Sequence, residues 1–291
     1  MIAINWGSSN FRAYRIDARG AVASERSSAR GALMVPPGGF YDALIDEVGD
    51  WIRTGEDKVL MCGMVGARRG WGEAPYVSVP ATFDEVVDGV ISLGLDSLDA
   101  RIVPGLIGAD ECGVPEVMRG EETELFGCVS ELGSYSRLCL PGTHSKWVTM
   151  EGGRIAAFTT WMTGDLYRAI RESTVLRSST QQESMEDDAF LSGVARAKQA
   201  GEFGHHLFGV RTLVLAGKMR ETSTASYLSG LLIGHEVKTM ARKNGSVHLV
   251  GEPALCSLYT RALMEFDVES STEPEGAALR GLIRIAGRLA W

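Results

Sequence analysis

The sequence predicts an α/β protein made of two halves of similar design, with a cleft between them. Two segments far apart in the chain, residues 1–16 and 137–149, share one plan: an apolar strand, a small polar turn containing glycine, and an alternating strand. Each segment is followed by further helix and strand patterns in a similar order, and internal similarity of this kind indicates a duplicated architecture. We therefore expect two α/β domains, residues 1–134 and 135–291, each with one hairpin lining the cleft.

The turn of the first hairpin consists of Gly7, Ser8, Ser9 and Asn10. Glycine tolerates a positive φ, and the alternating residues 11–16 are typical of a half-buried strand. Such a turn presents backbone N–H groups and two hydroxyls at one point, which suits an anion such as phosphate. Taken alone, this hairpin is better explained as a plain connection between two strands, because most Gly-Ser turns are only that.

The second hairpin repeats the design with Gly142, Thr143, His144 and Ser145, followed by Lys146 on the outgoing strand. The repetition favours the phosphate-binding interpretation for both turns. We expect His144 to be a hydrogen-bonded turn residue without an acid–base role. The Lys146 side chain could reach a phosphate or point away from it.

The remaining elements follow from hydrophobic periodicity and from glycine and proline positions. We expect helices over residues 40–53, 83–93, 121–132, 186–208, 224–243, 254–265 and 274–289, and one that begins after Thr163 as its N-cap. Further strands are expected over residues 20–26, 58–62, 100–103, 154–161, 246–250 and 267–271. The small residues in the run 229–234 favour close helix–helix packing.

Composition narrows the class of protein. Hydrophobic residues make up 45% and charged residues 23% of the chain, as in ordinary globular proteins. A net charge of −8 argues against nucleic acid or an anionic membrane as the main partner, but not against a small anionic substrate. The five cysteines have no metal-binding spacing and indicate reduced thiols, and neither a signal-peptide pattern nor a long apolar run occurs. We expect a cytoplasmic protein.

Five short strings carry a family resemblance. In chain order they are NWGSSNFR (5–12), GMVG with the following GW (63–71), MRGEET (118–123), PGTHSKW (141–147) and MTG (162–164). Together they closely resemble 2-dehydro-3-deoxygalactonokinases, which are sugar-acid kinases of the actin-like ATPase superfamily that also includes hexokinases and Hsp70. The strings at 118–123 and 141–147 are the most specific. The resemblance implies two actin-like ATPase (ribonuclease H-like) domains, each with a mixed five-stranded sheet and flanking helices.

The resemblance also implies a reaction. It is ATP-dependent phosphorylation of the 6-hydroxyl of 2-dehydro-3-deoxy-D-galactonate, a step of D-galactonate catabolism, with ATP and Mg²⁺ as cofactors. Two alternatives stay open: a kinase for a related 2-keto-3-deoxy sugar acid such as the gluconate epimer, and a catalytically weak nucleotide or sugar-acid sensor on the same fold. The oligomeric state is also open, with a homodimer as one option.

The proton of the sugar hydroxyl needs a base. The cluster Arg119, Glu121 and Glu122 occupies the place of the acidic base in similar sugar kinases. One glutamate would accept the proton while Arg119 steadies charge, with Glu121 preferred and Glu122 left open. The alternative is that acidic residues at a helix start only complement its dipole.

Asn5 departs from the family pattern. Similar sugar-acid kinases carry Asp at this place, where it orients Mg²⁺ through water. An Asn carbonyl can still hold a metal-bound water, but it is a poorer ligand for a hard cation than a carboxylate. The substitution implies weaker Mg²⁺ affinity, a lower rate or loss of activity.

The carboxylate of the substrate needs at least one arginine. The candidates are Arg12, Arg68 and Arg69, with Trp71 as a wall beside the sugar, although loop arginines are often merely solvated. On the nucleotide side, Gly251 follows a predicted buried strand and resembles the adenosine turn of the superfamily.

Overall fold

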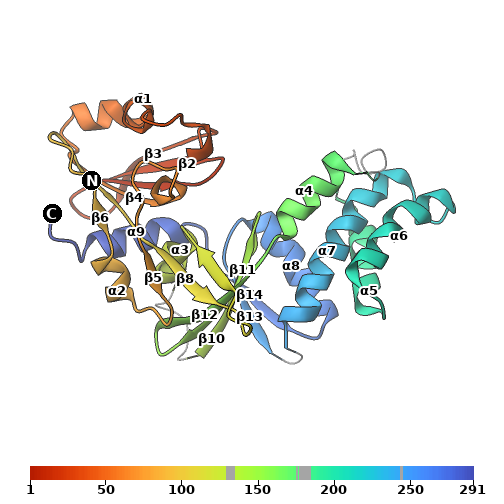
Figure 1. The fold of residues 1–291 in the computed structure, drawn as a ribbon. Coiled ribbons are helices and arrows are strands. Elements are labelled where there is room, and N and C mark those ends of the chain that lie inside the picture. The colour runs from red at the N-terminus through yellow and green to blue at the C-terminus, as the bar shows by residue number, and fades with distance from the viewer. Residues whose placement is uncertain (129–134, 175, 177–184, 243–244) are drawn as a thin grey trace. The chain divides into compact units, whose positions relative to one another are not determined.

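The computed structural model describes residues 1–128, 135–174, 176, 185–242 and 245–291, and its elements are labelled in Figure 1. The chain forms two compact units, residues 1–136, 148–158 and 276–291 in unit 1 and residues 137–147 and 159–275 in unit 2. The domain boundary expected at residue 134 falls in a segment outside the described residues, and it stays a prediction. Residues 276–291 belong to unit 1 together with the first half of the chain, because the C-terminal helix packs against that half.

Unit 1 contains a mixed sheet with the strand order β3-β2-β1-β4-β7-β6. Its strands are β1 (Ile2–Trp6), β2 (Phe11–Ile16), β3 (Val22–Ser28), β4 (Lys58–Gly63), β7 (Asp99–Ile102) and β6 (Ile91–Ser92). The first three strands form an antiparallel meander, whereas β4 and β7 continue the sheet in parallel. The edge strand β6 makes the sheet six-stranded instead of five-stranded.

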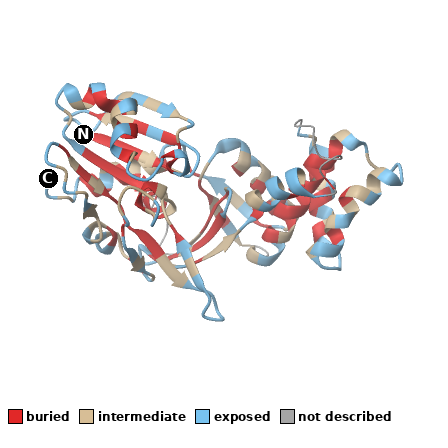
Figure 2. Cartoon of the chain, turned by 45° about the horizontal axis from the view of Figure 1, so that its top comes forward, coloured by how far each residue is buried: buried red, intermediate tan, exposed pale blue. Residues whose placement is uncertain are grey.

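Helices and a small second sheet complete unit 1. The helices are α1 (Phe40–Arg53), α2 (Phe83–Asp88), α3 (Glu121–Cys128) and α9 (Ala277–Ala286), with 3₁₀ turns η1 (Ala32–Met34) and η2 (Met64–Gly66). The strands of the small sheet, in the order β5-β8-β9, are β5 (Tyr76–Ser78), β8 (Gly105–Ala109) and β9 (Pro115–Met118). Alternate residues of β1 and the apolar stripe of α1 share one hydrophobic core. Figure 2 shows such buried residues running along the strands.

The second large sheet has the order β12-β11-β10-β13-β14, which repeats the order of the first sheet up to its sixth strand. Most of this sheet lies in unit 2. Its strands are β10 (Tyr135–Leu140), β11 (Ser145–Glu151), β12 (Arg154–Trp161), β13 (Ser246–Leu249) and β14 (Glu269–Thr272). The repeated order confirms the duplication that the two hairpins predicted.

The helices of unit 2 are α4 (Thr163–Ser173), α5 (Asp187–Lys198), α6 (Phe203–Leu215), α7 (Thr224–Met240) and α8 (Pro253–Glu265), with the 3₁₀ turn η5 (Glu221–Ser223). The long helix α7 is buried along most of its length. A Cβ on Gly230 of α7 would lie 1.9 Å from the Phe190 carbonyl oxygen of α5, so only glycine permits this approach. The close packing expected for residues 229–234 is confirmed.

Several sequence-based boundaries were wrong. The helix expected over 83–93 ends at Asp88, because Gly89 caps it and Ile91–Ser92 pair with β7. The helical segment 186–208 is two helices, α5 and α6. Thr163 is the first residue of α4 and Met162 is the N-cap, so the Thr163 hydroxyl does not cap the helix. The part of the 121–132 helix beyond Cys128 lies outside the described residues.

The described part of the chain is mixed α/β throughout. Its five cysteines are all free, as predicted. Within that part, no helix combines the length and the apolar character that crossing a bilayer requires.

Candidate active site

Asn5 lies near the C-terminal end of β1, level with Arg12 on β2 and Cys62 on β4. Residues level with one another in a sheet project from the same face. The neighbours of Asn5 in β1, Ile4 and Trp6, point into the hydrophobic core of unit 1. Asn5 and Arg12 therefore occupy the face of the sheet opposite that core.

The start of α3 approaches this face. The side chain of Thr123 on α3 lies close enough to the Cys62 thiol to oppose the rise in its pKa that burial causes. Gly120, with φ +110°, is so close to the end of β4 that an added Cβ would lie 3.2 Å from the Gly63 Cα. A Cβ on Gly63 would in turn lie 3.4 Å from Asn5 Oδ1. The structure thus brings Asn5 and the acidic start of α3 into one place within unit 1.

Glu122 is fully buried and bonded at both oxygens. Its carboxylate accepts hydrogen bonds from the Gly120 amide at 2.7 Å and from the Thr123 hydroxyl at 2.9 Å. Burial, followed by the nearby charge of Glu121, raises the pKa of Glu122 to about 7. Both oxygens hold the segment that leads into α3, so Glu122 acts as an anchor of this segment.

Glu121 is only partly buried, and its Oε2 accepts a hydrogen bond from the Arg119 amide at 3.0 Å. It is therefore the more accessible of the two base candidates. Glu124 lies one helical turn after Glu121, and it was not predicted from the sequence as a site residue. Burial and the charges of Glu121 and Glu122 raise the pKa of Glu124 to about 8, while Arg12 opposes the shift. We refer to Glu121, Glu122 and Glu124 as the acidic cluster.

The Arg119 guanidinium turns toward the small sheet. Its Nη2 donates to the Ala74 carbonyl oxygen at 2.8 Å, and its central carbon lies 4.4 Å from the centre of the Tyr76 ring. The buried nitrogens Nε and Nη1 have no hydrogen-bond partner among the described residues. Because buried donors are usually paired, this cation is held ready to bond a further acceptor.

The first turn is backed by the start of η1 and by Gly31 just before it. The amides of Ala32 and Leu33 donate to the carbonyl oxygens of Gly7 and Ser8, at 2.9 and 3.3 Å. In a trans peptide the N–H points opposite to the C=O of the same unit. The N–H groups of Ser8 and Ser9 therefore point away from this segment, on a turn whose residues 8–10 are exposed.

Gly31 fixes this arrangement sterically. A Cβ on Gly31 would lie 2.2 Å from the Ser8 carbonyl oxygen and 2.3 Å from the Ser9 Cα. The segment can press on the turn only because residue 31 has no side chain.

The second turn is backed in the same way by the start of α4. The Asp165 amide donates to the Thr143 carbonyl oxygen at 3.0 Å, which directs the His144 N–H away from the helix. A Cβ on Gly164 would lie 2.5 Å from the Gly142 carbonyl oxygen. The exposed His144 lies 3.5 Å from an Asp165 carboxylate oxygen, consistent with the expected role in the turn.

Ser145, the last residue of this turn, and Lys146, which follows it, are both buried. The Ser145 hydroxyl lies 2.8 Å from the Tyr259 hydroxyl, so it bonds inside unit 2 instead of facing outward with Thr143. The ammonium group of Lys146 donates to the His144 carbonyl oxygen at 3.4 Å. Gly251, with φ +147°, lies beside the start of the turn, since its added Cβ would be 3.5 Å from the Pro141 carbonyl oxygen. Of the nucleotide-side residues expected from the sequence, the structure gathers residues 142–146 and 251 in unit 2.

The candidates for the substrate carboxylate are less concentrated. Arg68 and Arg69 are exposed and follow η2, whereas Arg12 is exposed on the Asn5 face. Trp71 is partly buried and stacks on Phe40, with ring centres 6.4 Å apart and planes 14° apart. Packing against the core holds the Trp71 ring in place.

Sequence comparison decides the family. The profile of the family described as 2-keto-3-deoxy-galactonokinase matches residues 5–285. The chain belongs to the 2-keto-3-deoxy-galactonokinase family.

Two curated relatives of this family span nearly the whole chain. A protein of Rhizobium meliloti (strain 1021), described as a probable 2-dehydro-3-deoxygalactonokinase, is 35% identical over 99% of this chain and 97% of its own length. The 2-dehydro-3-deoxygalactonokinase of Escherichia coli (strain K12) is 32% identical over 97% of this chain and 96% of its own length.

One solved structure agrees with this family assignment, and a more distant one shares the fold. A crystal structure described as a 2-dehydro-3-deoxygalactonokinase protein from Sinorhizobium meliloti has a TM-score of 0.88 and 34% identity, covering 98% of this chain and 97% of that one. The activator of 2-hydroxyisocaproyl-CoA dehydratase from Clostridium difficile, with bound ADPNP, has a TM-score of 0.50 and 13% identity, covering 98% and 92%. This distant similarity concerns the fold alone.

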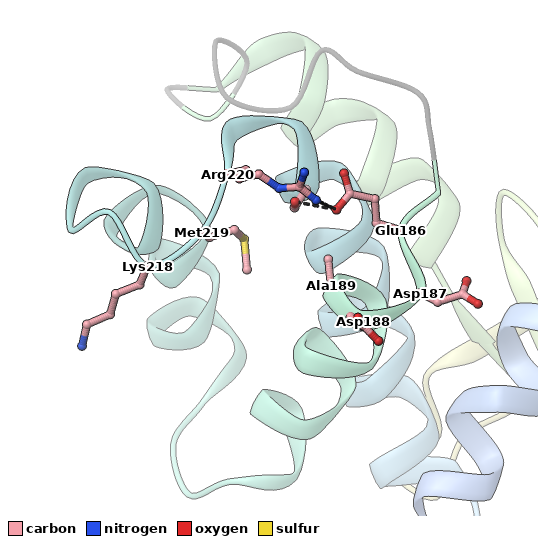
Figure 3. Close-up of a pocket in the computed structure, with 8 residues that line it drawn as sticks. Glu186, Asp187, Asp188, Ala189, Lys218, Met219 and Arg220 are labelled. Atoms are coloured by element: carbon pink, nitrogen blue, oxygen red, sulfur yellow. Dashed lines mark hydrogen bonds and ion pairs between the residues drawn. The ribbon is translucent and has the colours of Figure 1, made fainter.

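A kinase of this family needs a site for anions, and one pocket of unit 2 does not suit them. Figure 3 shows this pocket at the start of α5, where Glu186, Asp187 and Asp188 contribute carboxylates. Glu186 is bonded by Arg220 at 2.9 Å and by Ser223 at 2.7 Å, and Lys218 extends away from them. None of the site residues expected from the sequence lines this pocket.

Proposed function

We propose that this protein transfers the γ-phosphoryl group of ATP to the 6-hydroxyl of 2-dehydro-3-deoxy-D-galactonate, giving 2-dehydro-3-deoxy-6-phospho-D-galactonate. One observation carries the proposal beyond family membership. Each unit holds a glycine-containing turn whose carbonyls are bonded from behind, so that backbone N–H groups face outward. Phosphoryl transfer depends mainly on such preorganised donors and on positioning.

Within this proposal, Glu121 is the general base that accepts the proton of the sugar 6-hydroxyl. Its greater exposure supports this choice over Glu122, which is bonded at both oxygens. The unpaired nitrogens of Arg119 would bond an acceptor on the substrate or on the transferring group. Arg12, Arg68 and Arg69 remain candidates for the substrate carboxylate.

The donors near Asn5 fit magnesium. Among the described residues, no group of three or more His, Cys, Asp or Glu side chains is arranged to hold a metal ion. Magnesium in kinases is usually held by phosphate oxygens, water and only one or two protein oxygens. The Asn5 carbonyl and the carboxylates of the acidic cluster are oxygen donors of this kind, and the ion would neutralise charge on the phosphates.

We also propose the actin-like ATPase architecture, with two ribonuclease H-like domains of which each supplies one phosphate turn. The repeated strand order of the two large sheets supports it. The free cysteines support a reducing compartment such as the cytoplasm.

A coupled assay for ADP formation tests the function, with ATP, Mg²⁺ and either the galactonate-derived or the gluconate-derived 2-keto-3-deoxy acid. We expect turnover with a higher kcat/KM for the galacto epimer. Preference for the gluco epimer would reassign the substrate. Binding of ATP without turnover of either acid would instead support the sensor alternative.

A further inference from the structure

A buried carboxylate in unit 2 lies outside the residues considered so far. Glu236 is on α7 and is fully buried. Four side chains from three other elements hydrogen-bond it. These are Trp147 Nε1 at 2.7 Å, the Tyr259 hydroxyl at 2.7 Å, the Ser145 hydroxyl at 3.4 Å, and the Thr163 hydroxyl.

Two of these partners lie on the strand that leaves the second turn. Ser145 is the first residue of β11, and Trp147 is the next residue on the same face. The Tyr259 hydroxyl donates to Glu236 and lies 2.8 Å from the Ser145 hydroxyl, so it links the two groups. The Glu236 carboxylate therefore fixes both the position of β11 just after the turn and which face of this strand points toward α7.

The fourth partner lies on the helix that backs the turn. Thr163 is the first residue of α4, directly before Gly164, which touches the Gly142 carbonyl, and Asp165, which bonds the Thr143 carbonyl. Glu236 thus connects the two segments whose spacing decides where the amides of the second turn point.

We propose that Glu236 is a positioning residue for the second phosphate turn, which it holds between β11 and the start of α4. The inference rests on the proposed function, because it takes the turn to bind the phosphates of ATP. Without the carboxylate, the Trp147 indole N–H and the Thr163 hydroxyl lose their shared acceptor, and the turn is free to shift relative to α4.

The test is calorimetric titration of ATP into wild type and three variants, together with thermal unfolding and the KM of the sugar acid. Glu236→Ala removes the acceptor. Glu236→Gln is the conservative variant, because its amide can accept from Trp147 and donate to hydroxyls that turn to accept. Val237→Ala is the control, because Val237 is fully buried next to Glu236 but belongs to the hydrophobic core.

We expect Glu236→Ala to bind ATP at least about tenfold more weakly, the scale of one to two lost hydrogen bonds. The sugar-acid KM should change little. Glu236→Gln should restore ATP affinity, and Val237→Ala should lower the melting temperature without changing ATP affinity. Wild-type ATP affinity in Glu236→Ala, or an equal loss in Val237→Ala, would overturn the proposal.

If Glu236→Ala does not fold, Thr163→Val and Ser145→Ala each break one link and should weaken ATP binding in the same direction. Wild-type affinity in both would overturn the inference. Failure of the proposed function would look different: ATP binding would still depend on Glu236, but wild type would not turn over the sugar acid.

Discussion

The two hairpin turns are supported by the same kind of backbone contact, but the carboxylates that lie near them differ. In each, a glycine presses on the turn and a backbone amide from the next segment bonds a turn carbonyl, with Gly31 in unit 1 and Gly164 in unit 2. The strand face beside the first turn meets the acidic cluster, where burial and mutual repulsion raise the pKa of Glu122 and Glu124. Behind the second turn, Glu236 is a single carboxylate satisfied by four donors.

This difference suggests a division of labour between two copies of one design. Burial raises the pKa of Glu236 as well, so the distinguishing feature of the first region is its crowding of three carboxylates. Such crowding is typical of sites that bind cations or move protons. A fully bonded carboxylate surrounded by apolar side chains is instead typical of a structural anchor. The first turn would then serve the chemical step, and the second would mainly hold the nucleotide.

Loss of the proposed base should change the rate far more than it changes nucleotide binding. Glu121→Gln should lower kcat by about 10²–10⁴-fold, the usual range for loss of a general base, with little change in ATP affinity. Steady-state kinetics and ATP titration measure both quantities. Glu122→Gln should keep most of the rate, because a glutamine oxygen can still accept the Gly120 amide. If Glu122→Gln instead showed the full loss of kcat while Glu121→Gln kept a nearly normal kcat, Glu122 would be the general base.

A second prediction addresses what the turns share. Gly31→Ala and Gly164→Ala each place a methyl group within 2.2 or 2.5 Å of a turn carbonyl oxygen. Overpacking of this kind costs about 1–3 kcal/mol in the free energy of unfolding, and displacement of the turn should also weaken ATP binding. Denaturant unfolding and ATP titration measure both effects.

Gly204→Ala is the matched control, since an added Cβ there meets nothing within 4 Å and α6 favours alanine. Its stability and ATP affinity should match or exceed those of wild type. Normal ATP affinity in both turn variants would show that the backing glycines serve stability alone.

A third prediction concerns Asn5 beside the acidic cluster. Asn5→Asp should lower the Mg²⁺ concentration required at fixed ATP and raise kcat, because a carboxylate is the stronger ligand for a hard cation. It also adds a fourth carboxylate, so without Mg²⁺ the melting temperature should fall and then recover when Mg²⁺ and ATP are added. If neither Mg²⁺ dependence nor stability changed, Asn5 would not face the metal or the cluster.

The raised pKa of Glu124 should give the stability of the protein a modest pH dependence. The pKa of Glu124 rises from 4.5 to about 8 in the folded protein, mainly through burial. A raised pKa means that the folded state holds the proton more tightly than the unfolded state. The resulting stability is complete below about pH 4.5 and is lost as pH rises toward 8.

Glu124→Gln should remove this loss. Its melting temperature should exceed that of wild type by a few degrees near pH 8, and the gap should shrink near pH 5. A gap that stayed constant over this range would mean that Glu124 does not titrate with a raised pKa.

Much of this organisation could be predicted from the sequence, because the signals are local. The two glycine turns, their flanking strands and the repeat of the design can be read from short patterns, and so can the proximity of Asn5 to the start of α3 once the family pattern is seen. The partial burial of Glu124 and the full burial of Glu236 could not be predicted, since they depend on packing between distant segments. The hint for Glu236 was that it is the one acidic residue in the run 227–237, whose other residues, apart from His235, are apolar, aromatic or small.

Other features of the fold could not be predicted for the same reason. The strand β6 has only two residues and forms because it pairs with β7, so no sequence pattern of its own predicts it. The grouping of α9 with unit 1 depends on its close contact with α3, where a Cβ on Gly281 would lie 1.9 Å from the Thr123 carbonyl oxygen. Sequence position alone places α9 in the second half.

The outward face of each turn is proposed to hold phosphate, and the variant Gly142→Ala probes this face in the second turn. An added Cβ at Gly142 meets nothing within 4 Å of the protein, so the variant should fold and melt like wild type. It would place a methyl group in the space that the phosphates of ATP need. Calorimetric titration should show at least about tenfold weaker ATP binding at an unchanged melting temperature. Wild-type ATP affinity in Gly142→Ala would contradict the assignment of this turn to the phosphates.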